Sequence, residues 1–376
     1  MLGSYSDIMK YFSHITEDDR VPHALLLLGQ EGTGQLRAAV EWAKMLQCTE
    51  GELGSYCGKC KSCIKMDNFS HPDVHFAFPV IKHEKFKREE TTSKQFMDEW
   101  RHFLKTNIHG TISDWLDQIN GLNKTFNINV AECNEIIHNL GLKTYEGKYK
   151  IQIIWHAESL AKEGNRLLKL IEEPTGDTLI ILISQNHNAI LNTIQSRCQI
   201  LKLPAYTDSE IEGLLERDFD IDQKELKEFC FLADGNMRKA IELARHNSMN
   251  YSADMLDWLR KCYKADPDEL LSIVTDLNAF ERETLKAFFR YMLHFLREYL
   301  MAFQMQSSDN TRLSTTERNV VLKLQKILDL DKTCALQKLI NKNLAYIDRN
   351  LSIKIILMDM SLKINEILRA EVNKFA

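Results

Sequence analysis

The feature that most constrains this chain is a strand, a glycine-rich turn and a helix that follow one another from Leu25 onward. Residues 25–28 are four leucines, and Gly29, Gly32 and Gly34 space out the turn behind them. A buried strand that enters such a turn and then a helix is the setting of a phosphate-binding loop, because glycine lets backbone amides point at a ligand at the helix N-terminus. The sequence therefore predicts an α/β domain built around this loop.

The loop lacks the side chains that would hold a nucleotide. Gly29 and Gly34 have the spacing of the GxxxxGK[ST] pattern, but the next two residues are Gln35 and Leu36. A working loop has a lysine that contacts the outer phosphates and a hydroxyl that binds magnesium. Gln35 is uncharged and Leu36 cannot coordinate a metal. The pattern predicts the architecture of a nucleotide site without its chemistry.

A cysteine cluster follows the predicted helix. Four of the nine cysteines lie within sixteen residues, in the spacing C-x8-C-x2-C-x2-C: Cys48, Cys57, Cys60 and Cys63. Four thiolates this close in sequence can complete a tetrahedral zinc site, and a site with four protein ligands is closed and structural. His71 and His75 are alternative ligands, but four cysteines are already available. We therefore expect structural zinc bound by the four cysteines.

Composition limits the possibilities for the whole chain. Its 376 residues are enough for two or three domains of roughly 100–200 residues each. A net charge of −5 argues against a protein whose own surface is a basic footprint for nucleic acid. No uncharged run reaches the roughly 18–20 residues that span a bilayer, and the first residues do not resemble a signal peptide. We expect a cytoplasmic protein, in which clustered cysteines indicate metal rather than disulfides.

The second motif of a nucleotide site is also changed. Residues 151–155 read as a strand, and in a P-loop ATPase such a strand ends in Asp-Glu, which hold magnesium and orient the attacking water. Trp155 and His156 occupy these two positions. Glu158, two residues further on, reads as a surface or capping residue. We therefore expect no functional ATP site.

Strands and helices alternate through about the first 200 residues, with further strands predicted at 178–184 and 199–203. This alternation indicates a doubly wound α/β domain with a parallel sheet. Residues from about 80 to 128 read as an irregular, partly helical insertion, whose balanced charges indicate a solvated face rather than a DNA-binding patch. The aromatic residues scattered through the insertion are Phe86, Phe96, Trp100, Phe103 and Trp115.

Beyond Pro204 the pattern is helical only. Three short helices are predicted at 209–217, 223–233 and 237–246, and from residue 254 onward apolar stripes indicate helices that pack against one another. The polar stretch 307–316 reads as a loop. We predict three parts, which are an α/β domain at 1–204 with the cysteine module at 48–63, a small helical domain at 205–253 and a helical domain at 254–376.

Several short motifs occur in order along the chain. After the glycine turn and the cysteine spacing come Tyr-Glu-Gly-Lys-Tyr-Lys at 145–150, Leu-Leu-Lys-x-x-Glu-Glu-Pro at 167–174, Ser-Arg-Cys at 196–198 and Gly-Asn-x-Arg-x-Ala at 235–240. Together they resemble the clamp-loader ATPase subunits of the AAA+ superfamily. The resemblance covers residues 20–76 and 128–250, whereas the last third matches only as a helical domain of suitable length.

The resemblance implies a RecA-like (AAA+) domain, a small helical lid domain and an all-α collar through which five subunits form a ring. One member of the family does not itself bind and hydrolyse ATP, and Gln35, Leu36, Trp155 and His156 fit that member. The catalytically active gamma/tau subunit shares the cysteine spacing and Ser-Arg-Cys, but it should keep the lysine, the hydroxyl and Asp-Glu. The implied protein is not an enzyme on its own but a subunit of a DNA-directed DNA polymerase holoenzyme, a nucleotidyltransferase.

The resemblance also implies partners. The gamma/tau and delta subunits would form a hetero-pentameric ring with this chain, and the sliding clamp would bind transiently. The assembled complex would contact primer–template DNA. In this role the chain helps to load the clamp of DNA polymerase III during DNA replication.

Two arginines acquire roles from the resemblance. Arg197, in the Ser-Arg-Cys triplet, would act in trans as an arginine finger, which stabilises charge on a transferring phosphoryl group in the neighbouring subunit. The alternative for Arg197 is a structural salt bridge. Arg238 lies where the family carries a nucleotide-sensing lid arginine. Because the local site is degenerate, we expect Arg238 to serve lid packing.

Two other function classes remain open from the residues. A divergent ATPase of the same fold would have to use Arg37, Glu158 or Glu172 for phosphate and metal, although Arg37 lies about half a turn beyond the lysine position. A zinc-dependent nucleic-acid-binding module would need a basic face, which the composition does not indicate. Nucleotide binding and DNA binding by the isolated chain distinguish these classes.

Overall fold

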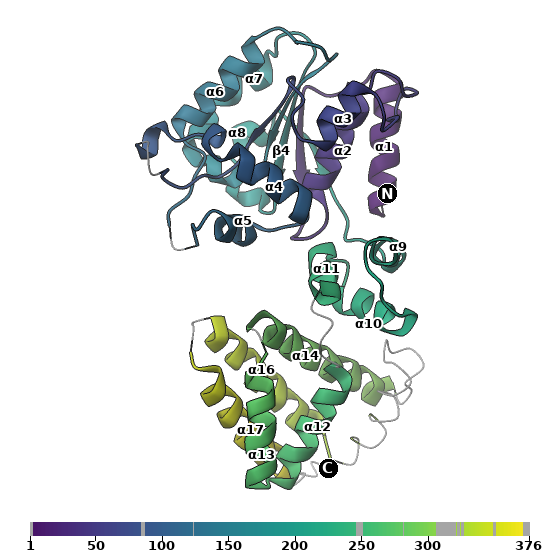
Figure 1. Ribbon diagram of the computed structural model, residues 1–376, viewed down its shortest axis with the longest axis vertical. Coiled ribbons are helices and arrows are strands. Elements are labelled where there is room, and N and C mark those ends of the chain that lie inside the picture. Colours follow the sequence, from purple (N-terminus) through teal and green to yellow (C-terminus); the bar gives the residue numbers. More distant parts are fainter. Residues whose placement is uncertain are drawn as a thin grey trace. The chain divides into compact units, whose positions relative to one another are not determined.

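The computed structural model describes residues 3–83, 87–122, 124–245, 251–280, 282–305, 321, 324, 327–348 and 351–370. The chain divides into two compact units (Figure 1). The first comprises Met1–Asp218 and Ala233–Ala240, and the second Phe219–Leu232 and Ile241–Ala376. The three-part division at residues 204 and 253 stays a prediction.

A parallel sheet forms the centre of the first unit. Its strands lie in the order β2-β3-β4-β1-β5, and all neighbouring pairs are parallel. They are β1 (Ala24–Leu28), β2 (Val74–Ala77), β3 (Lys150–Ile154), β4 (Thr178–Ser184) and β5 (Gln199–Lys202). All residues of β1, β3 and β4 are buried, as expected of inner strands covered on both faces. The predicted α/β fold class is confirmed.

Successive side chains of β1 point to opposite faces of the sheet, and both faces are covered, which explains the run of leucines. Leu26 and Leu28 belong to a core cluster with residues of α6 (Val130–Gly141), η3 (Ala157–Leu167) and α7 (Leu168–Glu172). Leu25 and Leu27 alternate with them and face the opposite side of the sheet. There lie α1 (Tyr5–Glu17) and α2 (Gln35–Gln47), whereas α6 and α7 lie on the other side (Figure 1).

The insertion at residues 80–128 contains more structure than the sequence indicates. It forms η1 (Arg88–Glu90), η2 (Ser93–Phe96), α4 (Met97–Asn107) and α5 (Ile112–Gln118). The prediction of a partly helical segment is confirmed, but a solvated face describes only its charged residues. Phe96, Trp100, Phe103 and Trp115 are buried. The last three pack on one another and on residues next to β2 and β3, and Phe96 packs edge-to-face on His83. Phe86 lies outside the described residues.

The remaining elements of the first unit are short. They are α3 (Lys61–Asp67), η4 (His187–Ala189), α8 (Asn192–Gln195) and α9 (Asp208–Asp218). The helix α11 (Met237–Arg245) begins in the first unit and ends in the second, and α10 (Gln223–Ala233) lies in the second up to its last residue. The three short helices predicted after Pro204 are therefore confirmed as α9, α10 and α11.

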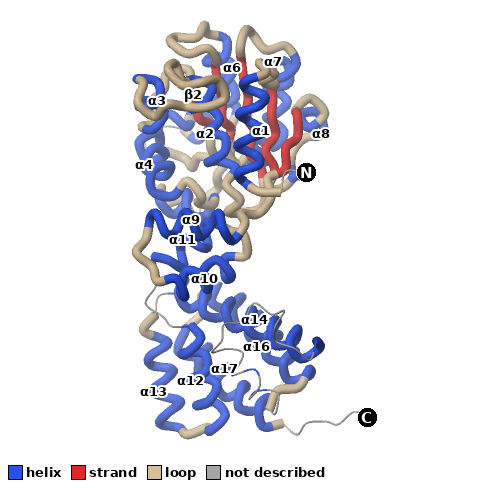
Figure 2. Tube along the Cα trace, turned by 90° about the vertical axis from the view of Figure 1, so that its right-hand side faces the viewer, coloured by secondary structure: helices blue, strands red, loops and turns tan. Residues whose placement is uncertain are grey.

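Helices joined by loops and turns make up the described part of the second unit, as Figure 2 shows by colour. Its other helices are α12 (Tyr251–Lys264), α13 (Pro267–Asn278), α14 (Arg282–Met305), α16 (Leu330–Asp348) and α17 (Ile353–Arg369). The helix α17 packs against α12, α13 and α16, and the buried Trp258 donates a hydrogen bond from Nε1 to Ser361 Oγ at 2.9 Å. The loop predicted at 307–316 lies outside the described residues. Within the described ranges, no helix is long and apolar enough to cross a membrane.

Candidate nucleotide pocket and metal centre

The glycine loop lies where the sequence places it, between β1 and α2. Gly32 and Gly34 have φ angles of 76° and 81°, a left-handed conformation that side chains disfavour. Thr33 closes the turn by donating from its backbone N–H and its Oγ1 to the carbonyl oxygen of Gln30, at 3.3 and 2.9 Å. The backbone of a phosphate-binding loop is therefore present.

The residues after the loop pack inward. Gln35, at the position of the motif's lysine, is only 6% exposed, and its Nε2 donates a hydrogen bond to the carbonyl oxygen of Gln30 at 3.0 Å. Leu36, at the position of the metal-binding hydroxyl, is also buried. The Gln35 side chain thus supports the loop itself. Neither Gln35 nor Leu36 offers a charge or a hydroxyl to a nucleotide.

Trp155 and His156, at the positions where we expect Asp-Glu in a P-loop ATPase, follow β3 directly. Trp155 directly follows β3 and is buried, with its ring centroid 5.2 Å from that of Trp100 and 5.7 Å from that of Phe103. His156 adopts a left-handed φ of 56°, its Nδ1 lies 2.8 Å from Ser159 Oγ, and burial lowers its pKa. An aromatic cluster that includes two residues of the insertion therefore occupies the place of a metal-binding carboxylate.

Glu158 is not the surface residue that its sequence position suggests. Its side chain is mostly buried, and Oε1 accepts a hydrogen bond from the backbone N–H of Gln185 at 3.2 Å. The same oxygen lies 3.7 Å from His156 Nε2. Glu158 thus anchors the segment that follows β4.

A small pocket remains between the loop, the ends of β3 and β4, and the insertion. Its volume is about 20 Å³, and about 10–15 Å³ of such space is needed for a single water molecule. The residues that line it are Gly32, Gly34, Gln35, Leu36, Ile108, His109, Gly110, Trp155, His156, Glu158, Ile183, Ser184 and Gln185. Burial, with a smaller contribution from the Arg37 charge, lowers the pKa of His109 to about 3, so this histidine is neutral. Sequence reasoning missed the insertion residues because no motif marks them.

The candidate arginines all have carboxylate partners. Arg37 donates from Nε to Glu41 Oε1 at 2.8 Å and lies over the ring of Tyr5. The Nε of Arg197 contacts the carboxylate of Glu172, and its Nη1 donates to the carbonyl oxygen of Thr193 at 3.0 Å. The Arg197 side chain is nevertheless 38% exposed.

Arg238 is engaged by a residue that the sequence does not single out. Its Nε and Nη2 donate to the two carboxylate oxygens of Asp114, in the insertion, each at 2.7 Å. Glu31, in the glycine loop, lies 3.8 Å from Arg238 Nη1. The pair Asp114–Arg238 therefore connects the insertion to the first turn of α11.

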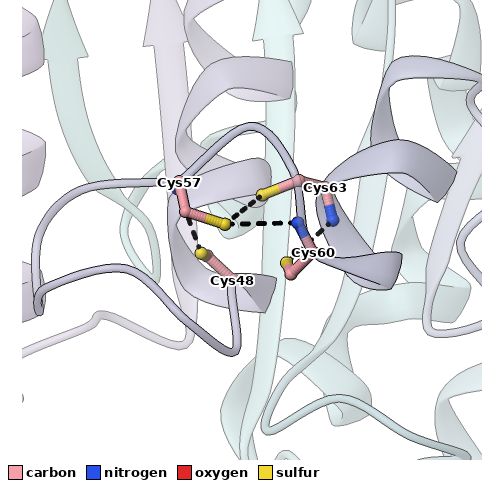
Figure 3. Close-up of side chains that lie close together, drawn as sticks. All are labelled: Cys48, Cys57, Cys60 and Cys63. Carbon is pink, nitrogen blue, oxygen red and sulfur yellow. Dashed lines mark hydrogen bonds between the residues drawn. The ribbon is translucent and has the colours of Figure 1, made fainter.

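The four cysteines converge between α2 and α3 (Figure 3). The sulfur atoms of Cys48, Cys57, Cys60 and Cys63 all lie within 4.8 Å of one another, and those of Cys57 and Cys63 are 4.0 Å apart. Tetrahedral zinc with bonds of about 2.3 Å places sulfurs about 3.8 Å apart, so this set fits a metal of that size. The alternative ligand His71 is buried, with Nε2 3.5 Å from Glu146 Oε1, and is not part of this cluster.

Backbone amides prepare the sulfurs to carry negative charge. The N–H groups of Gly51 and Cys57 donate to Cys48 Sγ at 3.2 and 3.3 Å, and those of Cys60 and Cys63 donate to the preceding cysteine of the cluster at 3.3 Å. Although burial opposes the charge, hydrogen bonds from Thr49 and Cys63 lower the pKa of Cys60 to about 5. Burial and neighbouring thiols raise the pKa of Cys63 to about 12. The proximity of the four sulfurs makes the cluster a metal-binding candidate.

The fold and the two sites together define an α/β protein with a five-stranded parallel sheet, a glycine turn between β1 and α2, and a four-cysteine cluster. Residues 5–207, more than half of the chain, match the family described as DNA polymerase III, delta subunit. The chain belongs to this family. Within it, the similarity is to delta-prime: the chain is 30% identical over 244 residues to DNA polymerase III subunit delta' of Bacillus subtilis, and 28% identical over 245 residues to that of Pseudomonas aeruginosa.

The alignments with these relatives span only part of each protein. Each of these two alignments covers 64% of this chain, and they cover 59% and 62% of the two relatives. The tau subunit of Bacillus subtilis is 25% identical over 255 residues, which is 66% of this chain and 37% of the relative. Among solved structures, a gamma subunit-related protein of Thermotoga maritima is 15% identical with a TM-score of 0.40, and the match covers 96% of this chain and 99% of that one.

Proposed function

We propose that this chain is a non-hydrolysing subunit of the DNA polymerase III clamp loader, which helps to place the sliding clamp on primer–template DNA. The observation that carries the proposal is the state of the nucleotide pocket. Gln35 is tied to its own loop and Trp155 lies in an aromatic cluster, so neither position offers a phosphate contact or a metal ligand. A chain of this kind contributes structure to an assembly whose other members use ATP.

The alternative function is that of a divergent ATPase, in which other residues replace the missing lysine and metal ligands. The contacts of the three candidate residues give this alternative little support. Arg37 is paired with Glu41, and Glu172 is paired with Arg197. Glu158 lines the pocket, but it accepts a hydrogen bond from the backbone of Gln185. None of these residues supplies both a phosphate contact and a metal ligand.

Arg197 is the residue through which the chain would influence ATP hydrolysis. In the proposed ring with gamma/tau and delta subunits, its guanidinium would leave Glu172 and reach the ATP of a neighbouring subunit. Its exposed side chain supports this proposal, because an exposed ion pair contributes little energy and is easily exchanged. The general effect of such a finger is on the order of 10³–10⁵ in rate.

The cysteine cluster is proposed to hold zinc. Cys48, Cys57, Cys60 and Cys63 would supply all four ligands, and the ion would cross-link the end of α2 to the start of α3. A closed tetrahedral site of this kind has no open position for a substrate, so its contribution is to folding.

Two measurements test the proposal. Calorimetry of the purified chain with ATP and magnesium is expected to show no binding, and the same sample is expected to contain about one zinc per chain. Tight, magnesium-dependent binding would overturn the non-hydrolysing role.

The second measurement uses the reconstituted loader. Arg197→Ala is expected to lower its ATPase rate while the ring still assembles. Arg166→Ala is the matched control, because Arg166 is also an exposed arginine paired with a glutamate, Glu163. Equal ATPase rates for the two variants would contradict the finger.

A further inference from the structure

The glycine loop and the start of α11 are in direct contact within the first unit. The backbone N–H of Met237 donates to the carbonyl oxygen of Gly32 at 3.0 Å. The side chain of Asn236 covers the same residue so closely that a Cβ atom on Gly32 would lie 1.9 Å from Asn236 Oδ1. The segment Asn236–Arg238 therefore lies directly against the glycine loop.

Asp114 presents its carboxylate to this segment in a fixed orientation. Both the backbone N–H and the Oγ1 of Thr111 donate to Asp114 Oδ2, at 2.7 and 3.0 Å, in a capping box that begins α5. The carboxylate then accepts two hydrogen bonds from Arg238 at 2.7 Å each. Despite burial, these donors lower the pKa of Asp114.

The core of the insertion determines where Asp114 lies. The next residue, Trp115, is fully buried, and its Nε1 donates to the carbonyl oxygen of Pro79 at 2.8 Å. Its ring packs edge-to-face on Trp100, with centroids 5.2 Å apart. Because Trp100 also contacts Trp155, one aromatic core replaces the metal-binding carboxylate and positions Asp114.

The Asp114 carboxylate binds Arg238 in the way that a phosphate group would bind it. An arginine fork binds a carboxylate and a phosphate with the same two-point geometry. The loop lacks the lysine that would help to hold a triphosphate, since Gln35 is in its place. The Asp114 carboxylate belongs to the chain itself, and it joins the insertion to Arg238 without any bound ligand.

We propose that Asp114 is an internal substitute for nucleotide: its carboxylate holds Arg238 and thereby keeps the first turn of α11 on the glycine loop. The insertion thus holds the first turn of α11 against the glycine loop at all times. A bound nucleotide would otherwise have to make this connection. The inference rests on the proposal that the chain does not use nucleotide, and it assigns a role to residues 80–128.

Hydrogen exchange of the full chain, without nucleotide, tests the proposal. In Asp114→Asn, which keeps the shape of the side chain and loses its charge, amides of residues 32–36 and 237–240 are expected to exchange about tenfold faster. Asp98→Asn is the matched control, because Asp98 lies on α4 of the same insertion and is 94% exposed in its pair with Arg101. Unchanged exchange in Asp114→Asn would overturn the proposal, as would equally faster exchange throughout the insertion.

A second measurement tests whether Asp114 takes the place of a nucleotide or only packs against Arg238. Millimolar tripolyphosphate is expected to slow exchange of residues 237–240 in Asp114→Asn, to leave the wild type unchanged, and to have no effect in Asp114→Asn/Arg238→Met. Absence of rescue in Asp114→Asn, or equal rescue in all three proteins, would overturn the substitution. ATP binding by the wild type would instead contradict the proposed function, so the two failures are distinguishable.

Discussion

Trp155 lies against Trp100 with ring centroids 5.2 Å apart, although the two residues come from β3's end and from the insertion. By its sequence position, Trp155 stands where we expect a P-loop ATPase to carry a metal-binding aspartate. The residue that follows β3 is therefore buried against the insertion instead of facing a ligand. The buried aromatic contact therefore contributes to the stability of the first unit.

Replacing Trp155 by alanine is expected to lower the free energy of unfolding by about 3–5 kcal/mol, because it leaves a cavity in the aromatic core. Chemical denaturation measures the change. Tyr145→Ala is the matched control, since Tyr145 is 82% exposed, and about 0.5 kcal/mol or less is expected there. A loss of that small size for Trp155→Ala would contradict the structural role.

Asp73 is expected to stabilise the turn before β3 in a pH-dependent manner. Its carboxylate accepts hydrogen bonds from the backbone N–H groups of Tyr145, Glu146 and Gly147, at 2.6, 2.9 and 2.7 Å. Although burial opposes the charge, these bonds lower the pKa of Asp73 below its ordinary value of 3.8. The stabilisation is therefore present above about pH 4 and is lost as the pH falls through the lower, folded-state pKa.

Asp73→Asn is expected to cost about 2–4 kcal/mol at pH 7, because three amides lose a charged acceptor. Denaturation curves at pH 7 and pH 3 measure the effect. The difference between variant and wild type should shrink at the lower pH, and a difference that stayed constant would show that the charge is not responsible.

Glu132 has the opposite dependence on pH. It lies buried at the start of α6, where Oε2 accepts a hydrogen bond from the Ser93 N–H at 2.5 Å, and burial raises its pKa to about 7. A carboxyl with a raised pKa stabilises the fold fully below its unfolded pKa of about 4.5, and this stabilisation is lost as the pH rises through about 7. At pH 8 the chain buries a charge.

Glu132→Gln is expected to increase the free energy of unfolding at pH 8 by on the order of 1–3 kcal/mol, because glutamine keeps an acceptor for Ser93 without the charge. Melting curves from pH 5 to pH 8 test this prediction. Wild-type stability should fall across that range relative to the variant, and parallel curves would contradict it.

Removal of the metal is expected to destabilise the first unit. Cys60→Ser, or a strong chelator, should release the bound zinc and lower the melting temperature, because the end of α2 and the start of α3 lose their cross-link. Metal analysis and thermal melting measure both effects. Cys334→Ser is the control, since Cys334 lies on α16 and outside the cluster, and a metal content equal to that of Cys60→Ser would contradict the assignment.

Some features of this protein could be predicted from short stretches of sequence because their cause is local. The run from Leu25 to Leu28, followed by Gly32 and Gly34, determines a buried strand and a left-handed turn. The spacing of the four cysteines predicts a cluster, because pairs of cysteines two residues apart in a tight turn can bind one metal ion together. The sequence also shows directly that glutamine, Gln35, stands at the lysine position of the pattern.

Other features depend on residues far apart in the sequence, and no periodicity records them. Asp114 meets Arg238 across 124 positions, and Asp73 holds a turn more than seventy residues away. The aromatic residues of the insertion look like a scattered set until Trp100 is seen against Trp155. Charged and apolar residues alternate there without a clear repeat, so the sequence suggested a solvated face. Only the tertiary structure decided which side chains are buried, because burial depends on the surface that the rest of the fold offers.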